Sequence, residues 1–193
     1  MSDFEIIKPL EITEQAAEVI DIVKGVVRTN GKDRIAIVEK QGWIAVPVET
    51  GCHLSSEEQE KLHLVLQRRK ISCFYAVAME QLSNFPKAFS IPASSEGIEE
   101  FNRCCGAFWF TIFSGKLDWL VLCTELDFYI VAGEESFVQQ FLGCSVEDAF
   151  LESSDFISDD SWSELMKSKL VRLYKTLKGE YFKWDPGQFV DIF

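Results

Sequence analysis

Positive charge is scarce in this chain. The 193 residues include 19 Lys and Arg against 31 Asp and Glu, which gives a formal net charge of −12. Proteins bind nucleic acid through clustered Lys and Arg that contact phosphates, and anionic membrane surfaces attract the same residues. We therefore expect neither a nucleic-acid partner nor a membrane partner.

Long apolar runs, a leader segment and dense cysteines are also missing. No stretch approaches the roughly 18 apolar residues of a membrane-spanning helix. The first residues, MSDFEIIKPLEITEQ, lack the basic segment followed by an apolar core that marks a secretory signal. Six cysteines in 193 residues are too few for a disulfide scaffold. These absences predict a cytoplasmic protein with reduced, mostly buried thiols.

The sequence contains none of the short motifs that identify common enzyme classes. It has no Walker loop, no G-x-G-x-x-G, no G-x-S-x-G and no H-E-x-x-H. Cys52 and His53 could act as a nucleophile and a base, and Cys52, His53, His63 and Cys73 could form a metal site, but neither set has the spacing of a known motif. We therefore predict no catalytic residue, no metal site and no cofactor.

Carboxylates that could serve acid–base catalysis all have simpler explanations. Glu125, Asp127 and Asp118 fall in predicted turns, where Asp is favoured. Glu134 and Glu135 open a predicted helix, where negative charge is stabilising by itself. These residues do not require a catalytic interpretation.

Two adjacent cysteines, Cys104 and Cys105, stand in the stretch FNRCCGAFWF. A disulfide between neighbours would be strained, because adjacent Cα atoms are about 3.8 Å apart and disulfides usually span more. Ile98, Phe101 and Cys105 recur at the spacing of a buried helical face. We therefore interpret Cys105 as a core residue and Cys104 as its neighbour near the rim.

Apolar spacing, caps and breakers predict the secondary structure. Helices are expected over 13–28, 55–70, 94–105, 134–142, 145–152 and 161–178. Strands are expected as a hairpin over 34–48 that turns near Gln41–Gly42, as one strand over 71–79, and as three strands over 107–113, 119–123 and 128–132. Residues 83–93 read as a loop with a short extended piece, and the tail over 181–193 is too apolar to remain unpacked.

Several details of these elements are specific enough to check. Ser55 and Glu58 have the spacing of a capping box. Gly106 is expected to end its helix, because glycine can adopt the left-handed conformation found at helix ends, and Gly143 is expected to end the next. Pro47 predicts that the second strand either lies at an edge or ends there, because proline cannot donate to a ladder. The inner side of the last helix is expected to consist of Trp162, Leu165, Met166, Leu170, Leu173 and Leu177.

These elements predict an α+β domain over 1–193, with a mainly antiparallel sheet built from hairpins and helices covering both faces. The last three strands are apolar at consecutive positions, which requires cover on both sides. A helix, then strands, then a helix begin at 13 and again at 94. This order raises the hypothesis of two similar helix–hairpin–helix lobes, 1–86 and 87–193, although the order is common and the halves share negligible residue identity.

The clearest anomaly is a window without Lys or Arg. Its acids are Glu134, Glu135, Glu147, Asp148, Glu152, Asp155, Asp159 and Asp160. Helix N-termini attract acids and could explain the window, whereas the stretch ESSDFISDD lacks the residues of a calcium loop. The alternative is a docking surface for a basic partner, because acidic residues speed encounter and fix orientation.

The candidate partner-binding residues in this window are Glu147, Asp148, Glu152, Asp155, Asp159 and Asp160. If the helix from 145 runs through Asp155, then Asp148, Glu152 and Asp155 share one side. Phe150 and Leu151 are expected to point toward the core.

The sequence therefore predicts a non-catalytic cytoplasmic module that binds a basic protein, such as an acidic inhibitor or an immunity-like protein. The alternative is an enzyme or small-ligand-binding protein with a pocket between the two halves, lined by aromatics such as Trp43, Trp109 and Trp119. A cleft of polar groups with shifted pKa values would favour the alternative, and a flat acidic face would favour the module. The oligomeric state is left open.

Overall fold

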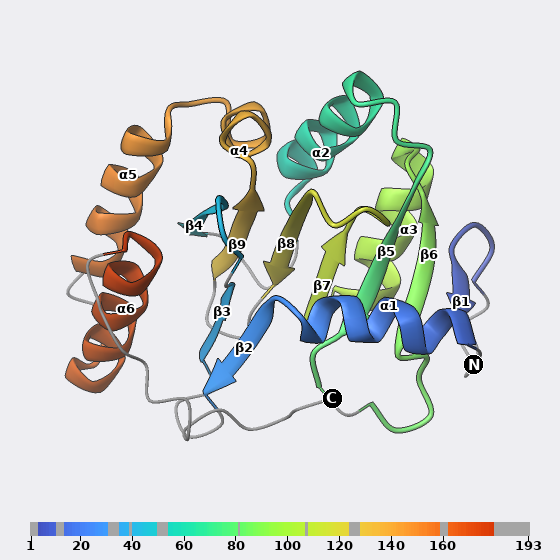
Figure 1. The fold of residues 1–193 in the computed structure, drawn as a ribbon, viewed down its shortest axis with the longest axis horizontal. Helices are drawn as coiled ribbons and strands as arrows, with labels where there is room; N and C mark the ends of the chain where they lie inside the picture. Colours follow the sequence, from blue (N-terminus) through green and yellow to red (C-terminus); the bar gives the residue numbers. More distant parts are fainter. Residues whose placement is uncertain are drawn as a thin grey trace.

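An antiparallel sheet of seven strands forms the centre of the protein. The computed structural model in Figure 1 describes residues 4–10, 14–30, 35–38, 40–49, 54–80, 82–106, 108–123, 128–158 and 162–179. From edge to edge the strands are β1 (Lys8–Leu10), β6 (Ala88–Pro92), β5 (Cys73–Ala78), β7 (Phe110–Phe113), β8 (Trp119–Cys123), β9 (Phe128–Gly133) and β4 (Ile44–Glu49). Pairs β5–β6, β7–β8 and β8–β9 are neighbours in both sequence and sheet. The predicted α+β class with an antiparallel sheet is confirmed.

Helices cover both faces of this sheet. On one face pack α2 (Ser56–Arg68), α3 (Ser95–Cys105) and α4 (Glu135–Leu142), whose apolar residues share one core with the sheet. The other face is crossed by α1 (Glu14–Lys24), as Figure 1 shows. The last two helices, α5 (Val146–Ser158) and α6 (Glu164–Leu177), lie beside β4 at the edge of the sheet.

Alternate residues of β8 show why the central strands are apolar throughout. Trp119 and Val121 belong to the core under α2 and α4, whereas Leu120 and Leu122 belong to the core on the opposite face. Successive side chains of a strand point to opposite faces, so a strand covered on both sides carries apolar residues at consecutive positions. The prediction of cover on both faces is confirmed.

The first strands differ from the prediction. The first helix ends at Lys24, and residues 27–30 form β2 (Val27–Asn30), which pairs with β3 (Ile35–Val38) as a separate ribbon. The chain does turn at Gln41–Gly42, but β4 pairs with β9 instead of β3, so 34–48 is not a hairpin. A β-branched segment has only a weak local preference for one strand partner. Tertiary contacts therefore decide which strands pair.

Pro47 lies in an edge strand, as predicted. Among the strands that the structure describes, β4 pairs with β9 on one side and has no neighbour on the other. The carbonyl oxygen of Pro47 accepts a hydrogen bond from the hydroxyl of Ser153 on α5. The N and O atoms of one residue in an antiparallel strand point to the same side, so the nitrogen of Pro47 faces away from β9, where the ladder does not need a donor.

The caps agree with the prediction except at Gly106. Ser55 and Glu58 form the full capping box of α2, and Gly143 ends α4 in the left-handed conformation at φ 79°. Gly106 does end α3, as predicted, but at φ −64° and therefore not in the left-handed conformation that glycine can adopt there. A glycine at this position permits the left-handed region without requiring it.

The inner face of α6 was predicted correctly except for one residue. Leu170 and Leu173 are buried, and Trp162, Met166 and Leu177 pack partly buried against the same core. Leu165 is 70% exposed, so its assignment to the inner side is wrong. The helix begins only at Glu164, with Ser163 as its cap, and Leu165 falls in its first turn, away from the apolar stripe.

A buried carboxylate holds the N-terminal segment against α3. Glu100 is 4% exposed. Its Oε2 accepts backbone N–H bonds from Ile6 at 2.7 Å and Ile7 at 2.6 Å, and its Oε1 accepts one from Glu5 at 2.9 Å. A guanidinium nitrogen of Arg103 lies 3.6 Å from Oε1 of Glu100. These interactions join residues more than 90 positions apart and position β1 beside β6.

Strands from both halves of the chain share the large sheet. β4 from the first half pairs with β9 from the second, and β5 pairs with β7. A division into two similar lobes, 1–86 and 87–193, is not confirmed by this arrangement. The apolar tail over 181–193 lies outside the described residues.

Candidate functional site

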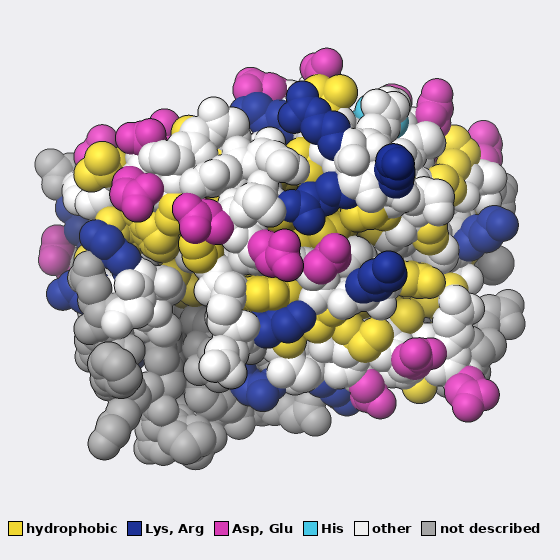
Figure 2. Space-filling view, turned by 45° about the horizontal axis from the view of Figure 1, so that its top comes forward, with side chains coloured by type: hydrophobic (Ala, Val, Ile, Leu, Met, Phe, Trp, Pro, Cys, Tyr) yellow, Lys and Arg dark blue, Asp and Glu magenta, His cyan; other side chains and the backbone are white. Residues whose placement is uncertain are grey.

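Four of the six predicted partner-binding residues lie together on the outer side of α5. Glu147, Asp148, Glu152 and Asp155 are all exposed. The helix runs through Ser158, so the condition for Asp148, Glu152 and Asp155 to share one side is met. Figure 2 shows acidic side chains over the upper left of the molecule, where α5 lies. The other two predicted residues, Asp159 and Asp160, lie outside the described residues.

An exposed leucine stands among these carboxylates. Leu151 is 65% exposed, so the expectation that it points toward the core is wrong, whereas Phe150 is buried as expected. Leu151 is one helical turn from Glu147, Asp148 and Asp155. The buried stripe of α5 consists of Val146, Ala149, Phe150, Ser153 and Ile157, and position 151 falls outside it. We call Glu147, Asp148, Leu151, Glu152 and Asp155 the α5 acidic surface.

The helix-terminus explanation accounts for only part of this surface. Glu147 and Asp148 lie in the first turn of α5, where carboxylates are favourable. Asp148 also accepts a hydrogen bond from the hydroxyl of Ser145 at 2.7 Å. Asp155 lies in the last turn, where the helix dipole disfavours negative charge, and Glu152 lies in mid-helix, beyond the reach of the dipole. The helix dipole therefore does not account for the charge at these two positions.

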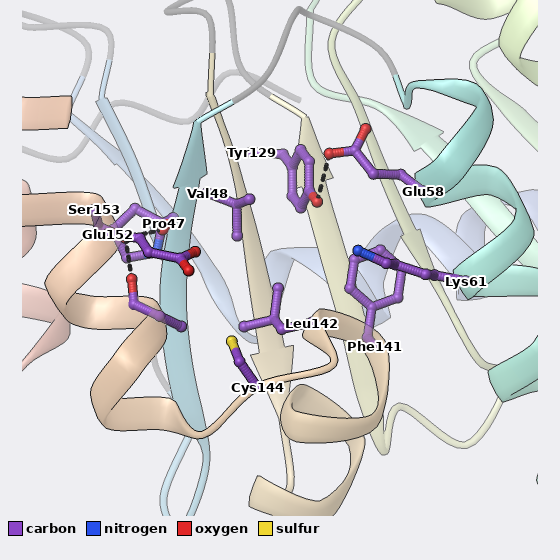
Figure 3. A pocket seen from close by; sticks show the side chains of 11 residues that line it. Pro47, Val48, Glu58, Lys61, Tyr129, Phe141, Leu142, Cys144, Glu152 and Ser153 are labelled. Atoms are coloured by element: carbon purple, nitrogen blue, oxygen red, sulfur yellow. Dashed lines mark hydrogen bonds between the residues drawn. The ribbon is translucent and has the colours of Figure 1, made fainter. Parts of the chain in front are cut away.

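A pocket of about 230 Å³ lies next to this surface, between α2, α4, α5 and the strands β4 and β9 (Figure 3). Residues from both halves of the chain line it: Pro47, Val48, Glu58, Lys61, Tyr129, Phe141, Leu142, Cys144, Ala149, Glu152 and Ser153. Trp43, Trp109 and Trp119, the aromatics proposed from the sequence, do not line it. Tyr129 and Phe141 supply its rings instead, 6.1 Å apart and nearly perpendicular.

Tyr129 and Glu58 form the polar end of the pocket. The Tyr129 hydroxyl donates a hydrogen bond of 2.9 Å to Oε1 of Glu58, while Oε2 of Glu58 accepts the backbone N–H of Ser55 at 2.6 Å. The capping box of α2 therefore fixes the position of the carboxylate that accepts the hydrogen bond of Tyr129. Burial, followed by the negative charge of Glu58, raises the pKa of Tyr129 far above its usual range, so this hydroxyl stays protonated at physiological pH.

Cys144 lies at the opposite end, close to charged groups of α5 and α2. Burial is the largest influence that raises the pKa of its thiol. Glu152 and then Asp148 raise it further, and each outweighs the opposing effect of Lys61. A thiol held protonated is a weak nucleophile, so Cys144 lacks the environment of a catalytic cysteine.

Of the proposed Cys–His and metal residues, only His63 and Cys73 can be placed, because Cys52 and His53 lie outside the described residues. His63 Nε2 lies 2.8 Å from Nε2 of Gln67, one turn along α2. The Cys73 sulfur lies 3.0 Å from the hydroxyl of Ser90. In the described ranges, no group of three or more His, Cys, Asp or Glu is placed to hold a metal ion.

The predicted turn and helix carboxylates that the structure describes lie in the turn and at the helix start where they were expected. Asp118 accepts a hydrogen bond from the hydroxyl of Ser114 and donates its own N–H back to that hydroxyl. Glu134 is the cap residue of α4, and Glu135 lies in its first turn. Glu125 and Asp127 are among the residues that the structure does not describe.

The adjacent cysteines have the predicted structural roles. Cys105 is fully buried with Ile98 and Phe101 in the core, and Cys104 is partly exposed. Both are free thiols. Burial is the main cause that raises the pKa of Cys105 to about 12, with smaller contributions from Cys104 and Glu100. The interpretation of Cys105 as a core residue is confirmed.

Thiol labelling is expected to separate these two cysteines. At about pH 8 an alkylating reagent should modify Cys104 in the native protein long before Cys105, because Cys105 is buried and protonated. Denaturation under non-reducing, thiol-blocked conditions should release all six cysteines of the sequence as free thiols. Peptide mass spectrometry reports both results, and a Cys104–Cys105 bridge in freshly purified protein would contradict this interpretation.

Comparisons with known proteins leave the function to be argued from the site itself. No family model, no curated protein and no solved structure matches the chain. Among the described helices, none is long and apolar enough to cross a membrane.

Proposed function

We propose that the protein is a non-catalytic cytoplasmic interaction module whose α5 acidic surface binds a basic protein. The observation that carries this proposal is Leu151, 65% exposed and placed among four exposed carboxylates. Two of these, Glu152 and Asp155, lie where they do not stabilise the helix. The sequence provides no Lys or Arg between Glu134 and Asp160 to neutralise them.

The two kinds of side chain on this surface would have different roles in binding. Carboxylates raise the rate of encounter with a positively charged protein and fix its orientation. An apolar side chain at the centre of a contact gains affinity when the partner covers it, and polar residues around it form the rim. An acidic protein bound in this way would block a basic surface of its partner, as an inhibitor or immunity-like protein does.

A second candidate function is the binding of a small ligand. The pocket beside α5 favours it, because it lies between residues of both halves of the chain and contains polar groups with raised pKa values, Tyr129 and Cys144. Its volume of about 230 Å³ is below the range typical of drug-sized ligands. A whole substrate of that size would not fit, but a single side chain or a very small molecule would.

Capture from extracts of the native host tests the first proposal with matched baits. Wild type and the variant Leu151→Ser are immobilised in parallel, together with Leu64→Ser as a control. Leu64 is 41% exposed on α2, away from α5. A partner of the α5 acidic surface should be basic, should be retained by wild type and by Leu64→Ser, and should be depleted on Leu151→Ser.

Affinity for that partner gives the quantitative prediction. Loss of a leucine that becomes covered on binding should weaken the complex by about tenfold or more, since burying such a side chain contributes roughly 1.5–3 kcal/mol. Leu64→Ser should stay within about twofold of wild type, as a residue outside the contact. Calorimetry measures both, and equal affinities for the two variants would exclude Leu151 from the contact.

A further inference from the structure

The pocket beside α5 offers a ligand almost only hydrogen-bond acceptors. Glu58 and Glu152 contribute carboxylates, and the Tyr129 oxygen retains a lone pair because its proton is donated to Glu58. Lys61 is the single cation among the described lining residues. A group that satisfies such a lining must carry several donors, which an anion such as a carboxylate or phosphate does not.

The positive charge of Lys61 is already paired. Its Nζ lies 2.8 Å from Oε1 of Glu57, one turn earlier on α2. The hydrogen bond and the charge of Lys61 lower the pKa of Glu57, in that order, as expected for an ion pair. The lining itself holds two carboxylates, Glu58 and Glu152, and one ammonium, Lys61, so the pocket is negative overall.

Glu152 is the carboxylate that still needs a partner. Its side chain extends from α5 across β4 toward the pocket, opposite Lys61 (Figure 3). Within the part of the chain that the structure describes, it makes no hydrogen bond or ion pair. Burial is the main cause that raises the pKa of the Cys144 thiol, and the charges of Glu152 and then Asp148 raise it further.

The walls of the pocket suit an alkyl stem below a cationic head. Val48 and Leu142 line the pocket and are partly exposed, so they supply apolar surface. Lys and Arg side chains pack their methylene groups along such surface. Ammonium and guanidinium groups carry donors and no acceptor, which matches the acceptor-rich end.

We propose that this pocket receives one Lys or Arg side chain of the basic partner. The inference rests on the proposed function, because the partner is held on the α5 acidic surface and Glu152 belongs to both that surface and the pocket. The cationic head lies between Glu58 and Glu152, and its stem lies against Leu142 and Val48. The pocket would thus select a single basic residue, while the acidic surface attracts positive charge in general.

Isolated side-chain analogues test the pocket without any partner. Purified ¹⁵N-labelled protein is titrated with N-acetyl-L-arginine amide and, in parallel, with N-acetyl-L-citrulline amide, which has nearly the same shape but no charge. The arginine analogue should produce saturable amide shifts at Tyr129 and Cys144. The citrulline analogue should bind about tenfold more weakly or worse, because charge-assisted hydrogen bonds are much the stronger.

Two variants of α5 provide the matched comparison. Glu152→Gln should weaken binding of the arginine analogue by about tenfold, since it removes the free carboxylate that lines the pocket. Glu147→Gln removes the same charge from the same helix without touching the pocket, and should change binding by less than about twofold, as expected for screened surface charge. Both residues are exposed, so neither change should affect folding.

The outcomes separate this inference from the proposed function. Absence of saturable shifts with the arginine analogue, or equal binding of the citrulline analogue, overturns the pocket assignment, even if the α5 acidic surface binds a partner. In a second outcome, the analogue binds but the association rate of the partner does not change when the charges of α5 are removed. In that case the partner is excluded as the source of the side chain. Saturable, charge-dependent binding together with a charge-dependent association rate supports both.

Discussion

Replacing Leu173 with aspartate is expected to unfold or aggregate the protein. Leu173 is 1% exposed on the inner side of α6 and belongs to the core on the α1 face of the sheet. The substitution would place a carboxylate among apolar side chains, where it has no partner, and would also remove the leucine contacts. The expected loss is at least about 3 kcal/mol, a large part of the stability of a typical domain.

Lys175→Glu on the same helix is the control. Lys175 is exposed two residues further on, and reversal of a surface charge usually changes stability by about 0.5 kcal/mol or less. Thermal unfolding followed by circular dichroism, with size-exclusion chromatography, distinguishes the two variants. Equal melting temperatures would show that the assigned inner face of α6 is wrong.

Replacing Glu100 with alanine is expected to be nearly as damaging. The carboxylate accepts the N–H groups of Glu5, Ile6 and Ile7, and alanine would leave these donors without their acceptor. Each buried donor left without an acceptor costs about 1–3 kcal/mol. The cost is smaller where water at the edge of the molecule can accept the hydrogen bond instead. We expect a loss of about 2–4 kcal/mol in the free energy of unfolding and release of β1 from β6.

The same carboxylate should make stability depend on pH. Burial by itself would raise the pKa of Glu100, but the backbone N–H bonds and Arg103 together hold it below the ordinary glutamate value. A carboxyl with a lowered pKa in the folded state stabilises the protein above its unfolded pKa, and this contribution is lost as pH falls through the folded pKa. The difference in unfolding free energy between wild type and Glu100→Gln should therefore be full above about pH 5 and shrink below about pH 4.

Glu99 provides the matched control for Glu100. It is the preceding residue on α3 and is exposed, so Glu99→Gln should leave stability and its pH dependence nearly unchanged. Denaturant unfolding over a pH series, with amide exchange at Ile6 and Ile7, measures both effects. Unchanged exchange at these two amides in Glu100→Ala would show that the carboxylate does not hold the N-terminal segment.

Local signals in the sequence were sufficient for much of the fold. The capping box at Ser55 and Glu58, the end of α4 at Gly143 and the apolar strands β7 to β9 each depend on residues within one element, and all were predicted correctly. The pairing of β4 with β9, and of β1 with β6, depends on segments far apart in the chain. A sequence pattern within either segment does not carry that information.

The site shows the same division. The acidic side of α5 could be predicted from the spacing of its carboxylates. The direction of Leu151 could not, because the sequence does not show which of the adjacent residues Phe150 and Leu151 belongs to the buried stripe. The buried stripe uses Phe150, which turns Leu151 outward. The bond between Tyr129 and Glu58 joins residues 71 positions apart. One polar hydroxyl in the otherwise apolar strand β9 is the only sequence signal that could have indicated the pocket.

The α5 acidic surface is tested most directly by the rate at which the captured partner associates, measured against ionic strength. The triple variant Asp148→Asn, Glu152→Gln, Asp155→Asn removes three exposed charges from α5, and the control Glu14→Gln, Glu18→Gln, Asp21→Asn removes three exposed charges from α1. At low salt the α5 variant should associate about tenfold more slowly than wild type, with a flatter salt dependence, because steering acts on the association rate. The α1 control should remain close to wild type, and both should keep wild-type stability. Equal association rates at low salt for wild type and the α5 variant would contradict the proposal that this surface receives a basic partner.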